Sequence, residues 1–402
     1  MQRTILHSDL NNCYASVESL FHPEYREIPM AVGGETEKRH GIILAKNEHA
    51  KKYGVKTAET IAEAKRKCPS LLIVPPRMHV YSQYCDAVAE IYKEYTNRVE
   101  SFGPDERWLD VTESGLRFGD GNTIAQEIRR RVKNETGLTV SIGVSYNKTY
   151  AKIGSDLKKP DAVTVVTREN RTRLIYPLPV GNMLFVGKST LQKLLSCGIY
   201  TIGELAAADD TVIRSLLGKN GEMLKRNAAG LDTSPVLRYD EGMPIKSIGN
   251  STTPLRDMKT PEDIRLIFDA LAAQVARRLR EHRLQCGGIQ IHIRYNTLET
   301  AERQRQLQTP TALSAEIASE AARLFAENFN LETPVRSVGI RAIHLSDADA
   351  PVQISFMEEF AKNERRKRLE TAMEALNKKY GKHTLTPARL LYDNTLMEIR
   401  KY

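Results

Sequence analysis

The chain has 402 residues, a formal net charge of +9 and 41% hydrophobic residues. This length suggests about two to four domains, and the composition excludes a mostly disordered chain or a fibrous repeat. No apolar run approaches the roughly 20 residues that span a bilayer, and the N-terminus lacks the apolar stretch and cleavage site of a signal peptide. The five cysteines are scattered, without metal-ligand or disulfide spacing, so we expect a cytoplasmic protein. The excess of 59 basic over 50 acidic residues is compatible with a polyanionic partner.

The N-terminal part of the chain alternates between short apolar runs and segments of helical spacing. Residues 4–9 predict a buried strand that ends at Asp9, and residues 99–102 and 107–111 predict a hairpin around Gly103 and Pro104. Other strands are expected at 29–32, 41–45 and 139–144, and helices at 15–20, 48–53, 61–67, 81–95 and 124–135. This order predicts an α+β fold in which helices cover one face of a sheet.

The rest of the chain contains two further regions of structure. Residues 178–208 predict two short helices, with turns at Val186-Gly187-Lys188 and at Gly198. Such a turn can direct backbone N–H groups at a phosphate, although a plain helical hairpin with glycine caps has the same spacing. After a linker at 233–244, helices at 262–282 and 313–329 and strands at 288–295 and 336–345 predict a four-stranded sheet with two helices.

Three carboxylates are candidates for a metal site. Asp9 closes the first strand, and Asp105 and Glu106 lie on the hairpin turn far along the chain. If the two strands are neighbours, the carboxylates converge and favour Mg²⁺. Two such ions about 4 Å apart catalyse phosphoryl or nucleotidyl transfer. The alternative is a strand cap beside a solvated acidic turn.

Lysines with helical spacing follow the strand at 139–144. Lys148, Lys152 and Lys159 lie there together with Asp156, and more lysines cluster between Lys46 and Lys56. Together they can neutralise a triphosphate, whereas each one alone is typical of a solvated helix face.

Several ordered motifs carry a specific resemblance. Residues 9–18, Asp-Leu-Asn-Asn-Cys-Tyr-Ala-Ser-Val-Glu, resemble the first palm motif of the Y-family translesion DNA polymerases, in particular the bacterial polymerase IV-like branch. Residues 101–112 resemble the second carboxylate motif of that family, and residues 141–160 a third. Segments at 186–190, 198–205 and 246–253 match later family segments in order, so the similarity covers about residues 4–350.

The resemblance implies a multidomain right-hand polymerase. The implied parts are a palm at 1–20 and 76–165, small fingers at 21–75, a helix-hairpin-helix thumb at 166–235, a little finger at 243–348 and a tail at 349–402. It further implies a monomeric, low-fidelity DNA-directed DNA polymerase that uses two Mg²⁺ ions, deoxynucleoside triphosphates and primer-template DNA. The rival interpretations are a catalytically silent DNA-binding protein of the same fold and a two-metal cyclase or nuclease.

The resemblance also assigns roles to individual residues. The metal ligands would be Asp9, Asp105, Glu106 and the carbonyl of Leu10, the first three being catalytic. The nucleotide-binding residues would be Tyr14, as the steric gate against ribose, with Lys51 and Lys152. DNA contacts are expected at Gly187, Lys188, Arg277 and Arg294, with Arg278, Arg280 and Arg283 nearby. A sliding-clamp peptide is expected at Gln353, Ile354, Phe356 and Met357.

The sequence departs from the family pattern close to the gate and the triphosphate. Lys51 stands where an arginine is common, and Glu48 where a triphosphate-binding tyrosine is common. A carboxylate at position 48 either points away from the nucleotide or weakens its binding. Asn12 and Cys13 replace larger residues beside Tyr14, which puts the strictness of sugar selection in doubt.

Overall fold

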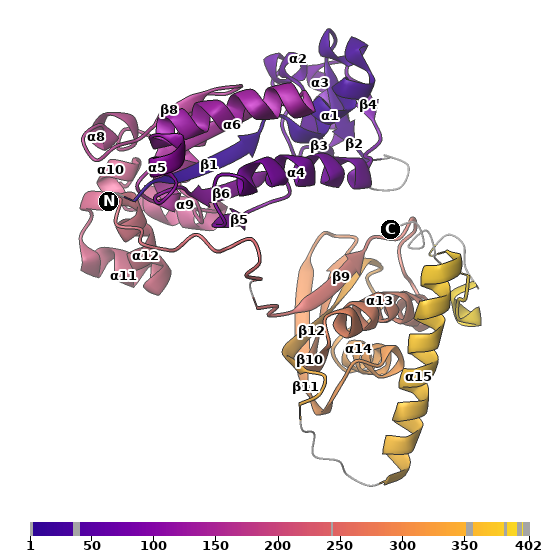
Figure 1. Ribbon diagram of the computed structural model, residues 1–402. Coiled ribbons are helices and arrows are strands. Elements are labelled where there is room, and N and C mark those ends of the chain that lie inside the picture. The colour runs from indigo at the N-terminus through magenta and orange to yellow at the C-terminus, as the bar shows by residue number, and fades with distance from the viewer. Residues whose placement is uncertain are drawn as a thin grey trace. The chain divides into compact units, whose positions relative to one another are not determined.

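The computed structural model describes residues 3–34, 41–242, 244–350, 357–381, 384–391 and 396. The described residues divide into two compact units, one ending at Gly242 and the other containing those from 244 onward. Both units contain helices and sheets (Figure 1), which confirms the expected α+β class.

The first unit is built on a five-stranded sheet with the order β5-β6-β1-β7-β8. Its strands are β1 (Ile5–Leu10), β5 (Val99–Ser101), β6 (Glu106–Asp110), β7 (Val140–Ser145) and β8 (Val163–Val165). Neighbouring strands are antiparallel except β7 and β8, which are parallel and are joined by α7 (Lys148–Leu157). The expected hairpin is confirmed, because β5 and β6 pair on either side of Gly103 and Pro104.

Helices cover both faces of this sheet, so the expectation of helices on one face is wrong here. Leu6 and Leu10 of β1 share a core with α4 (Met78–Lys93) and α6 (Gly121–Thr136). Ile5 and His7 point the other way, toward α7, since successive strand residues alternate between faces. Every residue of β1 is therefore buried.

A three-stranded sheet, β3-β2-β4, forms the next part of the first unit. Its elements are α1 (Cys13–Phe21), β2 (Met30–Gly33), β3 (Ile43–Lys46), α2 (Glu48–Lys52), α3 (Ile61–Lys67) and β4 (Leu72–Val74). Asn47 caps α2 by accepting a hydrogen bond from the Ala50 amide at 2.9 Å, and Thr60 and Glu63 form a capping box on α3. Both helices therefore begin where the sequence places a capping side chain.

Short helices around one apolar core follow β8. They are α8 (Arg171–Leu174), η3 (Val180–Asn182), α9 (Lys188–Ser196), α10 (Ile202–Ala207), α11 (Asp210–Leu217) and α12 (Lys219–Ala228). Gly187 stands immediately before α9, and Gly198, with φ of 75°, ends it. The two expected turns at these glycines are thus present.

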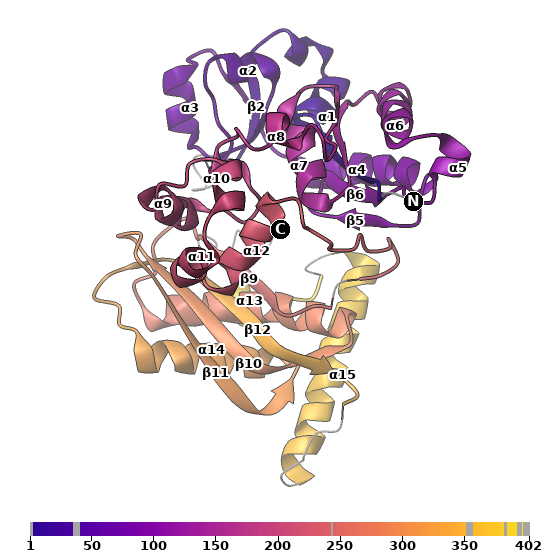
Figure 2. The same ribbon diagram turned by 90° about the vertical axis from the view of Figure 1, so that its left-hand side faces the viewer.

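The second unit contains a four-stranded antiparallel sheet with the order β11-β10-β12-β9. Its elements are β9 (Ile248–Thr252), α13 (Pro261–Glu281), β10 (Leu284–Tyr295), β11 (Thr300–Thr311), α14 (Ser314–Asn328) and β12 (Val335–Asp347). Figure 2 shows the sheet with α13 and α14 on one side. Ile289, Ile291 and Ile293 of β10 face those helices, as expected for a sheet with two helices.

The end of the chain packs onto this second unit. It contains α15 (Met357–Tyr380) and η4 (Ala388–Leu391). Glu370 of α15 accepts hydrogen bonds from Arg280 of α13 at 2.6 Å and from the Ser314 amide, at the start of α14, at 3.1 Å. Leu396 is 1% exposed within the core of the unit. Among the described helices, none combines the length and the apolar character needed to cross a membrane.

Candidate active site

Asp9, Asp105 and Glu106 lie together at one end of the five-stranded sheet. Asp9 pairs with Glu106 across β1 and β6. The Leu10 amide donates a hydrogen bond to the Asp105 carbonyl at 3.2 Å, which holds the hairpin turn beside the end of β1. The strand pairing therefore brings the expected carboxylates together, although nearly one hundred residues of sequence separate them.

Lysines from α7 and the turn after it point at these carboxylates. The Lys152 amine lies 3.3 Å from the Asp9 carboxylate and 3.2 Å from that of Glu106. The Lys159 amine lies 2.8 Å from Asp9, and both lysines also contact Asp156. Of the predicted lysines, Lys152 and Lys159 are thus part of the acidic site, whereas Lys148 pairs with Glu100 at 2.6 Å.

Gly143 of β7 allows α7 to lie close to the sheet. A Cβ atom at this position would stand 1.9 Å from the carbonyl oxygen of Ala151, which is backbone and cannot rotate away. Any other residue would therefore displace α7, and with it Lys152, from the carboxylates.

The three carboxylates differ in their electrostatic environment. Burial raises the pKa of Asp105, and the charge of Asp9 raises it further. Burial also opposes ionisation of Glu106, but the His7 ring and the Lys152 charge outweigh it and lower the pKa of Glu106 to about 2. Asp105 consequently takes up a proton at a higher pH than Glu106 does.

His7 is a site residue that the sequence analysis missed. Its Nδ1 lies 2.8 Å from the Ser155 hydroxyl and its Nε2 3.3 Å from Glu106. Burial lowers the pKa of His7, so the ring is neutral near pH 7. The alternation of β1 was a usable signal, because it places His7 on the same face as Asp9.

The donors of this cluster fit a hard divalent cation. In the parts of the chain that the structure describes, no three His, Cys, Asp or Glu side chains stand at metal-ligand spacing, and lysine amines contact the carboxylates instead. However, Asp9, Asp105 and Glu106 provide the oxygen ligands that Mg²⁺ prefers. Burial is the main cause of the raised pKa of Asp105, and the charges of Asp9 and Glu106 raise it further; a cation would relieve that repulsion.

Tyr14 is held by a chain of contacts on α4. Its ring stacks on that of Tyr81, with centroids 4.5 Å apart. The Tyr81 hydroxyl donates to Glu18 at 2.6 Å, and Arg77 donates to the same carboxylate at 3.0 Å. Cys13 lies beside this stack, with its sulfur 3.6 Å from that of Cys85. Neither Glu18 nor Tyr81 was found from the sequence.

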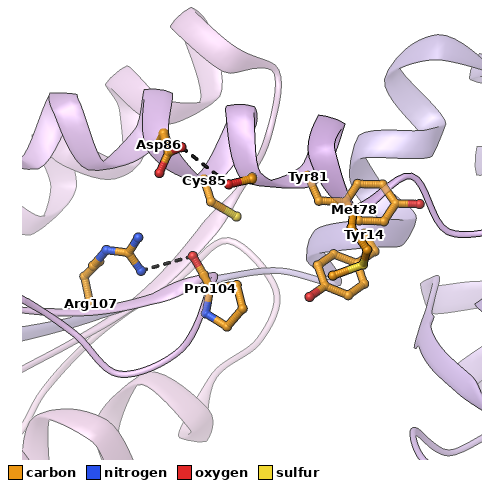
Figure 3. A pocket seen from close by; sticks show the side chains of 8 residues that line it. Tyr14, Met78, Tyr81, Cys85, Asp86, Pro104 and Arg107 are labelled. Carbon is orange, nitrogen blue, oxygen red and sulfur yellow. Dashed lines mark hydrogen bonds between the residues drawn. The ribbon is translucent and has the colours of Figure 1, made fainter. Parts of the chain in front are cut away.

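A cavity of about 370 Å³ lies next to Tyr14 and is shown in Figure 3. Tyr14 and Tyr81 form one end of it, and Cys85 and Asp86 of α4 line its wall. Pro104, which immediately precedes Asp105, lines it as well. Tyr14 therefore borders both an open space and the turn that carries Asp105.

Glu48 does not point away from the site. Its Oε1 accepts hydrogen bonds from the Asn12 amide at 2.8 Å and from the Lys51 amine at 2.7 Å. Two of the residues that depart from the family pattern, Asn12 and Glu48, are thus in direct contact, and Lys51 joins them.

The expected DNA-contacting residues lie in separate places. Gly187 and Lys188 begin α9 in the first unit, and no side chain caps that helix. In the second unit, Arg294 lies on the face of β10 that the helices leave uncovered, whereas Arg277 belongs to the helical layer. The expectation that Arg280 contacts phosphate is wrong, because this side chain is 13% exposed and pairs with Glu370.

The expected clamp peptide falls largely outside the described residues. Gln353, Ile354 and Phe356 are not among them, and for Met357 only the backbone is described, as the first residue of α15. This assignment stays a prediction.

Comparisons with known proteins give the family of the chain. Residues 8–156 match the impB/mucB/samB family, and residues 245–356 match the C-terminal domain of that family. The chain belongs to the impB/mucB/samB family, which confirms the resemblance to Y-family polymerases noted in the sequence.

Relatives match this chain over nearly its full length. DNA polymerase IV of Acetivibrio thermocellus is 47% identical over 399 residues, which is 99% of this chain and 100% of that protein. DNA polymerase IV 1 of Bacillus subtilis is 38% identical, over 94% of this chain and 91% of the relative. A chimeric Y-family DNA polymerase of known structure shares the fold, with a TM-score of 0.74 at 20% identity, over 85% of this chain and 98% of that chain.

Proposed function

We propose that this protein is a DNA-directed DNA polymerase of low fidelity that performs translesion synthesis. The observation that carries the proposal is the pairing of Asp9 with Glu106 across β1 and β6, with Asp105 on the adjoining turn. The intact cluster of carboxylates disfavours a catalytically silent DNA-binding protein, which has no use for three acidic side chains gathered at one point.

Asp9, Asp105 and Glu106, with the Leu10 carbonyl, would hold two Mg²⁺ ions. When bound, such ions activate the attacking hydroxyl and stabilise the leaving oxygen of a nucleotidyl transfer. The ionised state of Glu106 is maintained by His7 and Lys152. Lys152 and Lys159 would supply positive charge for the triphosphate, because both amines lie at the carboxylates that would hold the ions.

The incoming deoxynucleotide would be selected by Tyr14. An aromatic ring fixed under the sugar excludes a 2′-hydroxyl by steric collision. The Tyr81 stack holds that ring in one plane. Lys51 would contribute to triphosphate binding from α2, as a point charge and not as the bidentate group that arginine offers.

Primer-template DNA would contact Gly187 and Lys188 at the uncapped start of α9, where backbone N–H groups suit a phosphate. Arg294 would contact DNA from the uncovered face of its sheet, and Arg277 would contact it from the helical layer. We further propose a monomeric, cytoplasmic enzyme that docks on a sliding clamp through Gln353, Ile354, Phe356 and Met357.

Primer extension tests this function. The wild-type protein, given Mg²⁺, the four deoxynucleotides and an undamaged primer-template, is expected to lengthen the primer. The same assay with a template that carries an abasic site is expected to show bypass. Binding without extension would support the silent alternative, and shortening of the primer would support a nuclease.

A further inference from the structure

Glu48 is an acidic side chain in a mostly cationic part of the first unit. It begins α2, and its Oε1 accepts from Asn12, which stands between β1 and α1, and from Lys51, one turn along α2. The contact therefore links α2 to the turn that follows Asp9.

The surroundings of this contact are suited to an anion. Lys46 precedes α2, and Lys159 contacts Asp9. Burial lowers the pKa of Lys46, and the positive charges of Lys51 and Lys159 lower it further, against the opposite effect of Glu48 and Glu59. Glu48 places a negative charge in a region that otherwise favours phosphate oxygens.

The contact is weak enough for a nucleotide to compete with it. The side chains of Lys51 and Glu48 are 36% and 45% exposed, and ion pairs of this kind contribute about 0–1 kcal/mol. Glu48 is nevertheless ionised at neutral pH, because the hydrogen bonds from Lys51 and Asn12 outweigh the effect of burial on its pKa. A triphosphate that approaches Lys51 thus meets an amine already paired with a carboxylate.

We propose that Glu48 sets the nucleotide affinity of this polymerase by occupying Lys51 and repelling the triphosphate. This inference rests on the proposed function. A competing anion of this kind acts equally on the bound nucleotide and on the transition state, so it raises KM and leaves kcat unchanged. The enzyme consequently inserts nucleotides efficiently only when their concentration is high.

Glu48→Gln isolates the charge, because glutamine keeps the size of the side chain and still accepts a hydrogen bond from Asn12. We expect the KM for a deoxynucleotide to fall about twofold to fivefold, with kcat unchanged. Glu90→Gln is the matched control: Glu90 also pairs with a lysine three residues later, at 2.6 Å, but on α4. Its KM should equal that of the wild type.

Binding of inorganic tripolyphosphate, measured by calorimetry without DNA or metal, tests the same inference independently of catalysis. Glu48→Gln should bind this probe more tightly than the wild type, and adding Lys51→Met should abolish the gain. Equal binding by the wild type and Glu48→Gln would overturn the inference. So would a raised KM, which would make Glu48 a residue that orients Lys51.

The two proposals fail in different ways. A wild-type protein that never extends a primer contradicts the polymerase function, whatever the tripolyphosphate result. Normal extension by the wild type with an unaltered KM for Glu48→Gln contradicts only the role of Glu48.

Discussion

Tyr14 lies flat against Tyr81, with ring centroids 4.5 Å apart and ring planes 14° apart. Tyr81 is 1% exposed, and its hydroxyl is fixed by Glu18. The orientation of the proposed steric gate is therefore set by α4, an element outside the first palm motif. Although Cys13 beside Tyr14 is small, the stack on Tyr81 supports the Tyr14 ring.

Replacing Tyr14 and Tyr81 tests this support. Tyr14→Ala should raise ribonucleotide insertion relative to deoxynucleotide insertion by about tenfold or more, since the colliding ring is gone. Tyr81→Ala should raise the ratio less, about threefold, in line with the roughly 0.5–1.5 kcal/mol of an aromatic pair. Tyr84→Ala, which removes a ring on α4 that packs on Phe21, serves as control. An equal ratio in wild type and Tyr81→Ala, measured by single-nucleotide insertion, would contradict the role of the stack.

Glu18 gives a prediction about stability and pH. Burial opposes its ionisation, but Arg77 and Tyr81 outweigh this and lower the pKa of Glu18. Because the folded-state pKa lies below the unfolded value of about 4.3, the stabilisation is present above that pH and is lost as the pH falls through the folded-state pKa. Glu18→Gln should therefore cost about 2 kcal/mol near pH 7, and thermal unfolding should show this difference shrinking below about pH 4. A difference that is constant with pH would disprove the ion-pair account.

The metal-binding assignment is tested by Asp105→Asn. Loss of this charge should reduce primer extension about a hundredfold or more, while the affinity for primer-template DNA, measured by fluorescence anisotropy, stays near normal. Asp110→Asn is a suitable control, because Asp110 lies at the opposite end of β6 and pairs with Ile5. Near-normal extension by Asp105→Asn would remove this residue from the catalytic set.

The clamp peptide can be tested by changing Gln353, Phe356 and Met357 to Ala together. Apolar anchors in a groove each cost on the order of 2 kcal/mol when truncated, so stimulation by the host sliding clamp should disappear. Extension without the clamp should stay near normal, because the carboxylates belong to the other unit. A variant that melts earlier yet still responds to the clamp would show that these side chains only pack the tail.

Glu370 gives a prediction for the second unit. Its carboxylate accepts from Arg280 and from the Ser314 amide, so it serves as the cap that α14 otherwise lacks. Glu370→Ala should lower the stability of this unit by about 2–3 kcal/mol, since the buried Arg280 loses a partner. Differential scanning calorimetry would measure the change. Lys367→Ala, at an exposed position of α15, is the comparison, and equal melting of the two variants would contradict the capping role.

The sequence predicted the elements that have a strong periodic pattern, together with the residues of the acidic site. Asp9 was recognisable because it ends an apolar strand. Asp105 was recognisable because it lies in the turn that joins two strands of a hairpin. β11 was missed because it is mostly polar. Alternation would make Arg303 and Arg305 apolar, yet they face the helical layer and contact Phe329 and Glu320.

Several side-chain contacts between distant segments could not be predicted. The orientation of Glu48 depends on its hydrogen bond from Asn12, which lies 36 residues earlier in the chain. Arg280 had the spacing of a phosphate-binding residue, yet α15 supplies its partners, and nothing local to α13 indicates this. The capping boxes, in contrast, depend on neighbours three residues apart and are readable from the sequence.

Gly143 carries no functional group, yet it has a consequence for how this enzyme can evolve. The backbone of α7 fills the space where a side chain at position 143 would begin. Even alanine at this position would therefore reduce activity as much as the loss of Lys152. In a saturation mutagenesis screen for activity, position 143 should thus be as intolerant as position 152. Selection therefore acts on the distance between β7 and α7 as well as on the identity of the charged residues.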